Sequence, residues 1–157
     1  MVIFLATPAF CKETVFATKT FPKNQVVAID IHTESGNVTV NGKETPGVKV
    51  EALKPAGSKG KCELVTELAK GLLHVEARQP KYSLFDCDAG ILGSMPPRVI
   101  LVSYTGSGHI TADNLRNGAK ARTGSGNVSL KSIAGKVYIL TGSGNADVLS
   151  SGKLIRL

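Results

Sequence analysis

The sequence predicts an all-β protein, namely a single β-solenoid built of 18-residue repeats. Three observations favour this fold class: short runs of alternating apolar and polar residues, a high glycine content, and a tandem repeat over the last third of the chain. Of the 157 residues, 17 are glycine, only 5% are aromatic and none is tryptophan. Many turns and few bulky side chains are typical of thin, turn-rich β structures rather than of a thick globular core.

Apolar and polar residues alternate along most of the chain, which is the pattern of half-buried strands. Residues 25–32 (QVVAIDIH) give the clearest run, and Val38 with Val40 begins another. The runs span four to eight residues and end at Gly, Pro, Asn or Ser, so we expect strand–turn–strand connections throughout. Residues 54–60 and 79–97, which are interrupted by Gly and Pro, are predicted to be loops.

A tandem repeat decides between the β architectures. The tetrapeptide TGSG begins at Thr105, Thr123 and Thr141, so the same interval separates both successive pairs. A two-strand unit cannot bury its apolar face alone, whereas stacked units can, and each large aliphatic residue buried contributes about 1.5–3 kcal/mol. The aligned apolar columns are Ile110, Val128 and Ala146; Ala112, Leu130 and Val148; Ala119, Val137 and Ile155; and Ala121, Ile139 and Leu157.

The residues of the TGSG turns are predicted to be structural. Glycine adopts positive φ without a Cβ clash, so paired glycines suit a chain that must turn sharply between strands. The intervening serine hydroxyls can hydrogen-bond locally, and His109, Asn127 and Asn145 stand where asparagine side chains commonly stack in a ladder. The predicted turn residues are Gly106, Ser107, Gly108, Gly124, Ser125, Gly126, Gly142, Ser143 and Gly144.

We predict that the chain has two parts, an N-terminal segment of residues 1–20 and a β-solenoid domain of residues 21–157. Residues 2–10 (VIFLATPAF) are apolar, resemble the core of a secretory signal and are too few to span a bilayer. No basic residue precedes Lys12, so a first β-strand is the alternative. We therefore predict an export-signal-like or disordered segment at this end, and no transmembrane helix anywhere in the chain.

Three cysteines, Cys11, Cys62 and Cys87, lack the C-x-x-C spacing and the histidine partners of a zinc site. A disulfide between Cys62 and Cys87 would close a loop of about 25 residues and contribute about 3 kcal/mol in an oxidising compartment. The alternative is a pair of buried thiols that pack as small apolar groups.

The formal net charge of +7 predicts attraction to anionic partners. The basic residues are scattered, without a run of five or six and without an interleaved aromatic stacking platform, so a specific nucleic-acid site is not expected. A solvated basic face is the simplest interpretation. The partner classes left open are an envelope polymer, a glycan and a protein.

The sequence offers no catalytic constellation, cofactor site or metal site. TGSG lacks the third glycine of a dinucleotide fingerprint, because Thr111 stands there, and Ser107 lacks the flanking glycines of a nucleophile elbow. Asp86 and Asp88 are the only close pair of carboxylates, in a Gly/Pro-rich loop where solvated acids are common. The three histidines are isolated from one another in sequence. We therefore predict a non-enzymatic protein without cofactors.

Residues 95–157 resemble the bacterial putative-adhesin family of unknown function, which is related to the head GIN domain. The matching features are Pro97 before a strand, the turns beginning at Ser107 and Ser125, and the corners at 115–118 and 133–135. SGNVTV from Ser35 also matches, so the resemblance reaches most of the chain beyond about residue 21. It implies a right-handed β-helix without a catalytic site, exported to the periplasm, the cell envelope or the extracellular space of a bacterium.

Together these observations predict a non-enzymatic exported β-repeat module, an adhesin or a cell-envelope structural or interaction protein. The alternative is a carbohydrate-binding or polysaccharide-active β-helix protein. A lyase of that class is disfavoured because the repeat region contains only Asp113 and Asp147 as acids. A third interpretation is a scaffold subunit that self-associates through its C-terminal coil, because open strand edges invite pairing.

Overall fold

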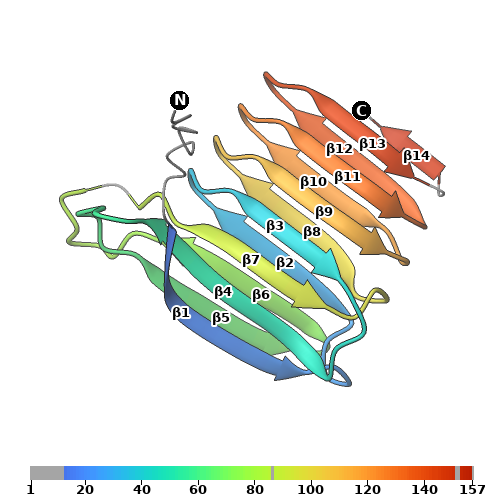
Figure 1. Cartoon of the computed structure of the whole chain (residues 1–157), viewed down its shortest axis with the longest axis horizontal. Helices are drawn as coiled ribbons and strands as arrows, with labels where there is room; N and C mark the ends of the chain where they lie inside the picture. The colour runs from blue at the N-terminus through green and yellow to red at the C-terminus, as the bar shows by residue number, and fades with distance from the viewer. Residues whose placement is uncertain (1–12, 86, 151–152, 157) are drawn as a thin grey trace, which may run out of the picture.

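The computed structural model describes residues 13–85, 87–150 and 153–156, and within these ranges the chain forms two seven-stranded β-sheets (Figure 1). The neighbouring strands of sheet A are, in order, β1 (Glu13–Pro22), β4 (Gly47–Pro55), β7 (Gly90–Met95), β3 (Val38–Gly42), β9 (Ile110–Leu115), β11 (Val128–Ile133) and β13 (Ala146–Ser150). Those of sheet B are β14 (Lys153–Arg156), β12 (Lys136–Thr141), β10 (Ala119–Thr123), β8 (Ile100–Thr105), β2 (Ala28–Thr33), β6 (Leu72–Arg78) and β5 (Glu63–Ala69).

Each sheet buries one face in a single core. Buried residues alternate with exposed or half-buried ones along the strands, as in β6, where Leu73, Val75 and Ala77 are buried. The buried side chains are mostly Val, Ile and Leu, which pack well on a pleated surface. Large side chains that are completely buried include Ile29, Ile31, Ile91, Leu101, Ile110, Leu130 and Ile139.

The prediction of an all-β protein is confirmed, but the prediction of a single right-handed β-solenoid over residues 21–157 is wrong. Both sheets are mixed. The pairs β1–β4, β4–β7 and β5–β6 are antiparallel, while the other neighbouring strands are parallel. All the antiparallel pairs are made by strands that end at or before Met95. One uniform coil therefore does not run through the chain.

A tight hairpin is one physical reason for this difference. Lys70 and Gly71, between β5 and β6, have φ of 52° and 80°. Positive φ at both central residues is the requirement of a type I′ turn, whose twist matches that of two antiparallel strands. The chain therefore reverses here instead of advancing to a parallel neighbour.

In the carboxy-terminal part, the alignment of the repeats gives the observed strand pairing. β9, β11 and β13 are parallel neighbours, and Val128 lies opposite Ile110 on one side and Ala146 on the other. In sheet B, Ala119 lies opposite Val137 in the same way. Equivalent residues of successive repeats therefore stack directly, and aliphatic columns run across both sheets.

Residues 43–99 are inserted between two structurally adjacent units. Val38 of β3 lies opposite Ile110 of β9, and Ile29 of β2 lies opposite Leu101 of β8. Four repeat intervals separate the members of each pair in the sequence, yet the strands are direct neighbours. The inserted residues form β4, β5, β6 and β7, which extend the two sheets on the other side of β2 and β3.

The ends of the predicted segments also differ from the structure. The boundary placed between residues 20 and 21 falls inside β1, because sheet A already begins at Glu13. The signal-like residues 2–10 lie outside the described residues. The segment 79–97, predicted to be a loop, contains β7. No helix in the described ranges is long and apolar enough to cross a bilayer.

The TGSG glycines allow close backbone stacking, and the positive φ predicted for them is wrong in most cases. Positive φ occurs instead at the other corner of the repeat, at Gly118 (97°) and Gly135 (87°). A Cβ on Gly126 would overlap the carbonyl oxygen of Gly108, so only glycine lets successive turns approach this closely. In the described part of the chain, the turn glycines outside the left-handed region are Gly106, Gly108, Gly124, Gly126 and Gly142.

Threonine supplies the hydroxyl of each turn, in place of the serine that we predicted. Thr105 Oγ1 donates to Gly36 O at 2.9 Å and accepts from Gly108 N at 3.1 Å. Thr123 Oγ1 donates to Gly108 O at 3.0 Å. Both threonines are buried, whereas Ser107 is exposed. The buried hydroxyl therefore ties each turn to the preceding one.

The predicted side-chain ladder is present, and it begins one unit earlier, at Asn37. The backbone N–H of His109 donates to Asn37 Oδ1, that of Asn127 donates to His109 Nδ1, and that of Asn145 donates to Asn127 Oδ1. Each of the three distances is 2.9 Å. Histidine thus replaces asparagine in the ladder without breaking it.

Candidate functional site

The outer face of sheet B gathers the polar and aromatic side chains that are the best candidates for a site. Because the strands are in register, outward residues at equivalent positions line up in rows, with about 4.8 Å between strands. The Tyr104 row contains Glu76, His32, Tyr104, Arg122 and Leu140. The Asp30 row contains His74, Asp30, Val102, Lys120 and Tyr138.

The charge along the two rows changes sign from one side of the sheet to the other. Glu76 on β6 and Asp30 on β2 are acidic, whereas β10 carries Lys120 and Arg122. Tyr104 on β8 lies between the acidic and the basic strands. We refer to the two sides as the acidic half and the basic half of this face.

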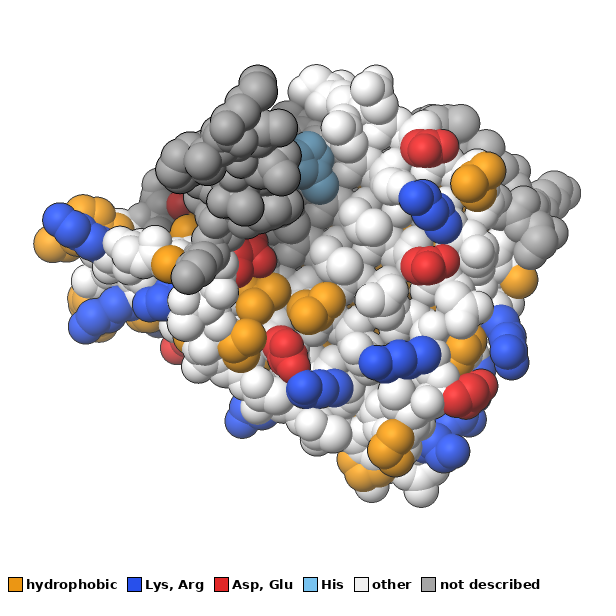
Figure 2. Space-filling model, in the orientation of Figure 1, with side chains coloured by type: hydrophobic (Ala, Val, Ile, Leu, Met, Phe, Trp, Pro, Cys, Tyr) orange, Lys and Arg blue, Asp and Glu red, His pale blue; other side chains and the backbone are white. Residues whose placement is uncertain are grey.

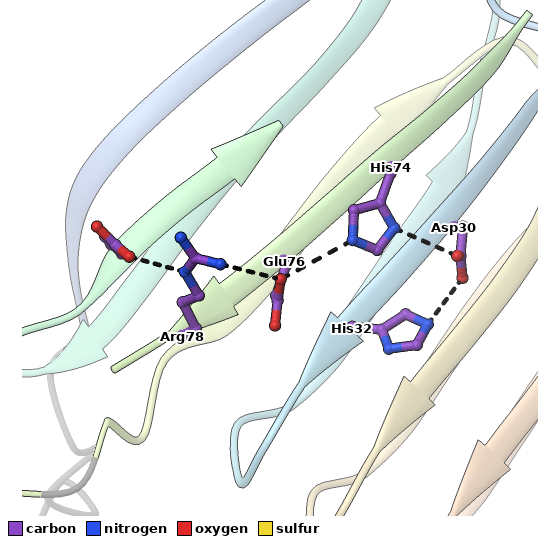
Figure 3. A network of polar contacts seen from close by, with 6 residues as sticks. Asp30, His32, His74, Glu76 and Arg78 are labelled. Carbon is purple, nitrogen blue, oxygen red and sulfur yellow. Dashed lines mark hydrogen bonds and ion pairs between the residues drawn. The ribbon is translucent and has the colours of Figure 1, made fainter. Parts of the chain in front are cut away.

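Asp30 lies between two histidines in the acidic half (Figure 3). Its Oδ2 is 3.3 Å from Nδ1 of His74 in a hydrogen bond, and its Oδ1 is 3.1 Å from Nε2 of His32. Oδ1 is buried and accepts no hydrogen bond from the described residues, so the short distance to His32 Nε2 is its principal polar contact. The centroids of the two imidazole rings are 5.4 Å apart. Asp30 therefore holds both rings together on this face.

Ion pairs continue from His74 to the edge strand β5 (Figure 3). His74 Nε2 and Arg78 Nη1 lie 3.9 Å and 3.8 Å from Glu76 Oε2, and Arg78 Nε donates to Glu63 Oε1 at 2.7 Å. The hydrogen bond to Glu63 and the negative charge of that carboxylate raise the pKa of Arg78. The carboxylates of this half are therefore already engaged by imidazole and guanidinium groups.

Tyr104 separates two shallow, open cavities. One, of about 280 Å³, is bounded by Tyr104 with His32 and Glu76, and the other, of about 210 Å³, by Tyr104 with Arg122 and Leu140. The Tyr104 ring centroid is 5.5 Å from the ring centroid of His32 and 5.8 Å from Arg122 Cζ. Tyr104 remains 37% exposed. A ligand lying across the face would contact this ring and both cavities.

The basic half presents two exposed cations supported by aromatic rings. Arg122 lies over the ring of Tyr104, and Lys120 Nζ is 5.2 Å from the ring centroid of Tyr138. Cation–π contacts orient the positive groups without neutralising them. Within the described residues neither cation has an ion-pair partner, so both are free to meet an anionic ligand.

This arrangement suits the binding of charged ligands. Among the residues that the structure describes, no group of three or more His, Cys, Asp or Glu side chains could hold a metal ion. Recognition of an extended charged molecule is the chemistry that the face supports best.

Sequence analysis missed this face. Asp30 and His74 are 44 residues apart, and only the parallel pairing of β2 with β6 brings them together. A weak signal was present, because Asp30 with His32 and His74 with Glu76 each follow an i, i+2 spacing that puts both residues on one strand face. That spacing shows a shared face but not a shared site.

Cys62 and Cys87, the predicted pair, form a disulfide with a Cα–Cα distance of 5.3 Å. It links the loop before β5 to the loop before β7, and Cys87 is buried. Of the predicted carboxylate pair, Asp88 accepts a hydrogen bond from Ser35 Oγ at 2.6 Å, while Asp86 lies outside the described residues. Asp88 is therefore engaged with the turn that contains Ser35.

The fold is similar to that of a putative cell adhesion protein from Clostridium sporogenes ATCC 15579, with a TM-score of 0.53 and 13% identity, over 89% of this chain and 99% of that one. A putative adhesin from Bacteroides fragilis NCTC 9343 matches at 12% identity over 92% of this chain and 97% of that one; its TM-score of 0.36 is too low to carry an argument. No protein-family model and no curated protein matches the sequence. The likeness shows the fold alone. The relation to the putative-adhesin family and to the head GIN domain stays a prediction.

Proposed function

We propose that the protein is a non-enzymatic, exported recognition module of the adhesin type, which binds an acidic envelope polymer or glycan across the outer face of sheet B. The observation that carries this proposal is the Tyr104 row together with Lys120 of the neighbouring Asp30 row. The exposed Tyr104 ring joins two open cavities, and Arg122 and Lys120 beside it have no ion-pair partner among the described residues. An extended anionic chain fits such a surface because its successive charged groups can meet Arg122 and Lys120, which lie on the same face of β10.

Two further observations support the adhesin type. The fold is shared with a protein from Clostridium sporogenes described as a putative cell adhesion protein. The Cys62–Cys87 disulfide favours an oxidising compartment, since structural disulfides are rare in reducing cytosol. We therefore include adhesion and export in the proposal for this chain.

The absence of enzymatic activity is also part of the proposal. A glycoside hydrolase of the common type needs two carboxylates free to act on one bond, as acid and as base or nucleophile. Here Asp30 faces two histidines, and Glu76 is near both His74 and Arg78. These contacts favour a structural and electrostatic role for both carboxylates.

A binding screen tests the proposal. The purified chain is applied to immobilised acidic and neutral envelope polymers and glycans at about 0.03 M and about 0.3 M salt, because exposed charges attract one another over longer distances at low salt and are screened at high salt. We expect binding to acidic polymers that weakens at high salt, and weak binding to neutral ones. Release of shortened saccharides during incubation would contradict the non-enzymatic part.

Matched variants locate the binding face. Arg122→Gln and Lys120→Gln should each weaken binding several-fold, because each removes one unpaired cation from the basic half. Arg116→Gln and Lys131→Gln remove exposed cations from outside this face, Lys131 lying on β11 of sheet A, and should change binding by less than about twofold. Equal losses in both sets would show that net charge, and not the Tyr104 row, determines binding.

A further inference from the structure

One loop at the β5 end of the molecule exposes a group of large apolar side chains. The loop between β6 and β7 carries Tyr82, Leu84 and Phe85, which are 95%, 93% and 53% exposed. Figure 1 shows this loop projecting beyond the sheets together with the loop between β4 and β5. Figure 2 shows hydrophobic and basic side chains side by side at this projecting end. Exposed apolar groups of this kind often mark interaction sites.

The apolar side chains are held outward by a defined turn. The backbone N–H of Ser83 donates to Pro80 O at 3.0 Å, and its Oγ donates to Phe85 O at 3.0 Å. Gln79 Nε2 donates to Ser83 O at 2.8 Å. The Cys62–Cys87 disulfide ties the base of this loop to the neighbouring one. The loop therefore has a local structure that presents Tyr82, Leu84 and Phe85 instead of burying them.

Lysines surround the apolar group. Lys59 and Lys61 of the neighbouring loop border a shallow depression of about 240 Å³ together with Tyr82, Leu84 and Phe85. Lys81 is exposed beside Tyr82. None of the three lysines pairs with an acid in the described part of the chain. The combination is an apolar tip with a positive rim.

We propose that this tip docks on an anionic phospholipid bilayer, with Tyr82, Leu84 and Phe85 entering the interface and the three lysines meeting lipid phosphates. A convex apolar tip with a positive rim is complementary to a soft, negatively charged interface, where aromatic and aliphatic side chains are favoured and each nearby lysine adds attraction. A stable protein partner requires about 800 Å² from each side, which three side chains do not provide. The docking tip uses none of the residues of the Tyr104 row, so it is independent of the proposed function.

Vesicle co-sedimentation of the oxidised full chain tests this inference. We expect binding to vesicles that contain phosphatidylglycerol and much weaker binding to pure phosphatidylcholine. Lys59→Gln, Lys61→Gln and Lys81→Gln should each reduce the partition coefficient about fivefold. The triple variant Tyr82→Ser, Leu84→Ser, Phe85→Ser should reduce it at least about tenfold. Lys131→Gln and Leu149→Ser, which change an exposed lysine and an exposed leucine far from the tip, should leave it unchanged.

A fluorescent reporter shows which part of the molecule enters the lipid. The chain has no tryptophan, so Phe85→Trp introduces a single tryptophan at an exposed position, and its emission can be excited selectively. We expect a blue shift of its emission when phosphatidylglycerol vesicles are added, because the indole leaves water. Co-sedimentation without a blue shift would overturn the inference, and so would full binding by the triple serine variant.

The two proposals fail separately. Arg122→Gln and Lys120→Gln should keep vesicle binding even where they lose polymer binding. If the wild-type chain stays in solution with both kinds of vesicle, the tip does not dock on a bilayer, and the inference is overturned. That result would leave the polymer-binding proposal untouched.

Discussion

Strand pairing differs between the two ends of the sheets. From β8 onward, each strand pairs in parallel with the equivalent strand of the next repeat, and equivalent aliphatic residues stack in columns. Before β8, a hairpin, a disulfide and antiparallel partners determine the arrangement. A repeat therefore specifies neighbours only where its units follow one another without an insertion. The outer face of sheet B joins both regions, since its acidic half comes from the irregular end and its basic half from the repeats.

The largest effect is expected from a charge placed in a repeat column. Val128→Asp puts a carboxylate into a position that is 1% exposed, between Ile110 and Ala146. We expect a loss of at least about 4 kcal/mol and unfolding of the domain in thermal denaturation. Thr111→Asp, on the exposed face of β9, is the matched control and should change stability by less than about 1 kcal/mol. Full thermal stability of Val128→Asp would refute the stacked columns.

Removal of the disulfide should mainly affect the irregular end. The double variant Cys62→Ser, Cys87→Ser releases a closed loop of about 25 residues, and we expect a loss of about 3 kcal/mol. Amide hydrogen exchange should show lower protection in β5 and β6 than in β10 and β12, because the constraint acts only on the first pair. Equal loss of protection in all four strands would mean that the two ends unfold as one unit.

A methyl group in the turn stack tests the role of the glycines. Gly126→Ala brings a Cβ onto the carbonyl oxygen of Gly108, and we expect a loss of about 1–3 kcal/mol. For a chain of this length that corresponds to a decrease in Tm of about 2–4 °C for each kcal/mol. Ser125→Ala changes an exposed neighbour and serves as the control. An unchanged Tm for Gly126→Ala would show that successive turns can move apart easily.

The smallest effect is expected in the side-chain ladder. His109→Asn restores the residue type of the neighbouring units and should change stability by less than about 0.5 kcal/mol. His109→Ala removes the acceptor of the Asn127 N–H and should cost about 1 kcal/mol. Chemical denaturation of the two variants, with hydrogen exchange of the Asn127 amide, measures both effects. Faster exchange in His109→Asn would show that the imidazole has a role that asparagine cannot fill.

The strand pairing of the repeat region could be predicted from the sequence. The spacing of Thr105, Thr123 and Thr141 and the aligned aliphatic columns predicted which strands are neighbours in the repeat region. The disulfide partner of Cys62 was also identified. In contrast, the turn glycines were assigned to the wrong cause, because a sequence shows that a Cβ is absent but not which carbonyl oxygen would meet it.

The structure of the irregular end could not be predicted from the periodicity of the sequence. β7 was predicted to be part of a loop because Gly90 and Gly93 interrupt it, yet a Cβ on Gly90 would lie 2.9 Å from Asn37 O, so glycine permits the approach of the neighbouring chain. The Asp30 network was missed for a related reason. Its members come from β2 and from β6, which lies within the insertion, and the 44 residues between Asp30 and His74 are not a multiple of the repeat interval.

The insertion of residues 43–99 has a consequence for the order of folding. Contacts among β8, β10 and β12 join residues one repeat apart, whereas β2 reaches β8 only by closing a loop four times as long. Loop-closure entropy rises with loop length, and distant contacts slow folding. We therefore expect the repeats to assemble first and to provide a template onto which β2 and β3 dock late. In this order, the basic half of the outer face exists before the acidic half is added.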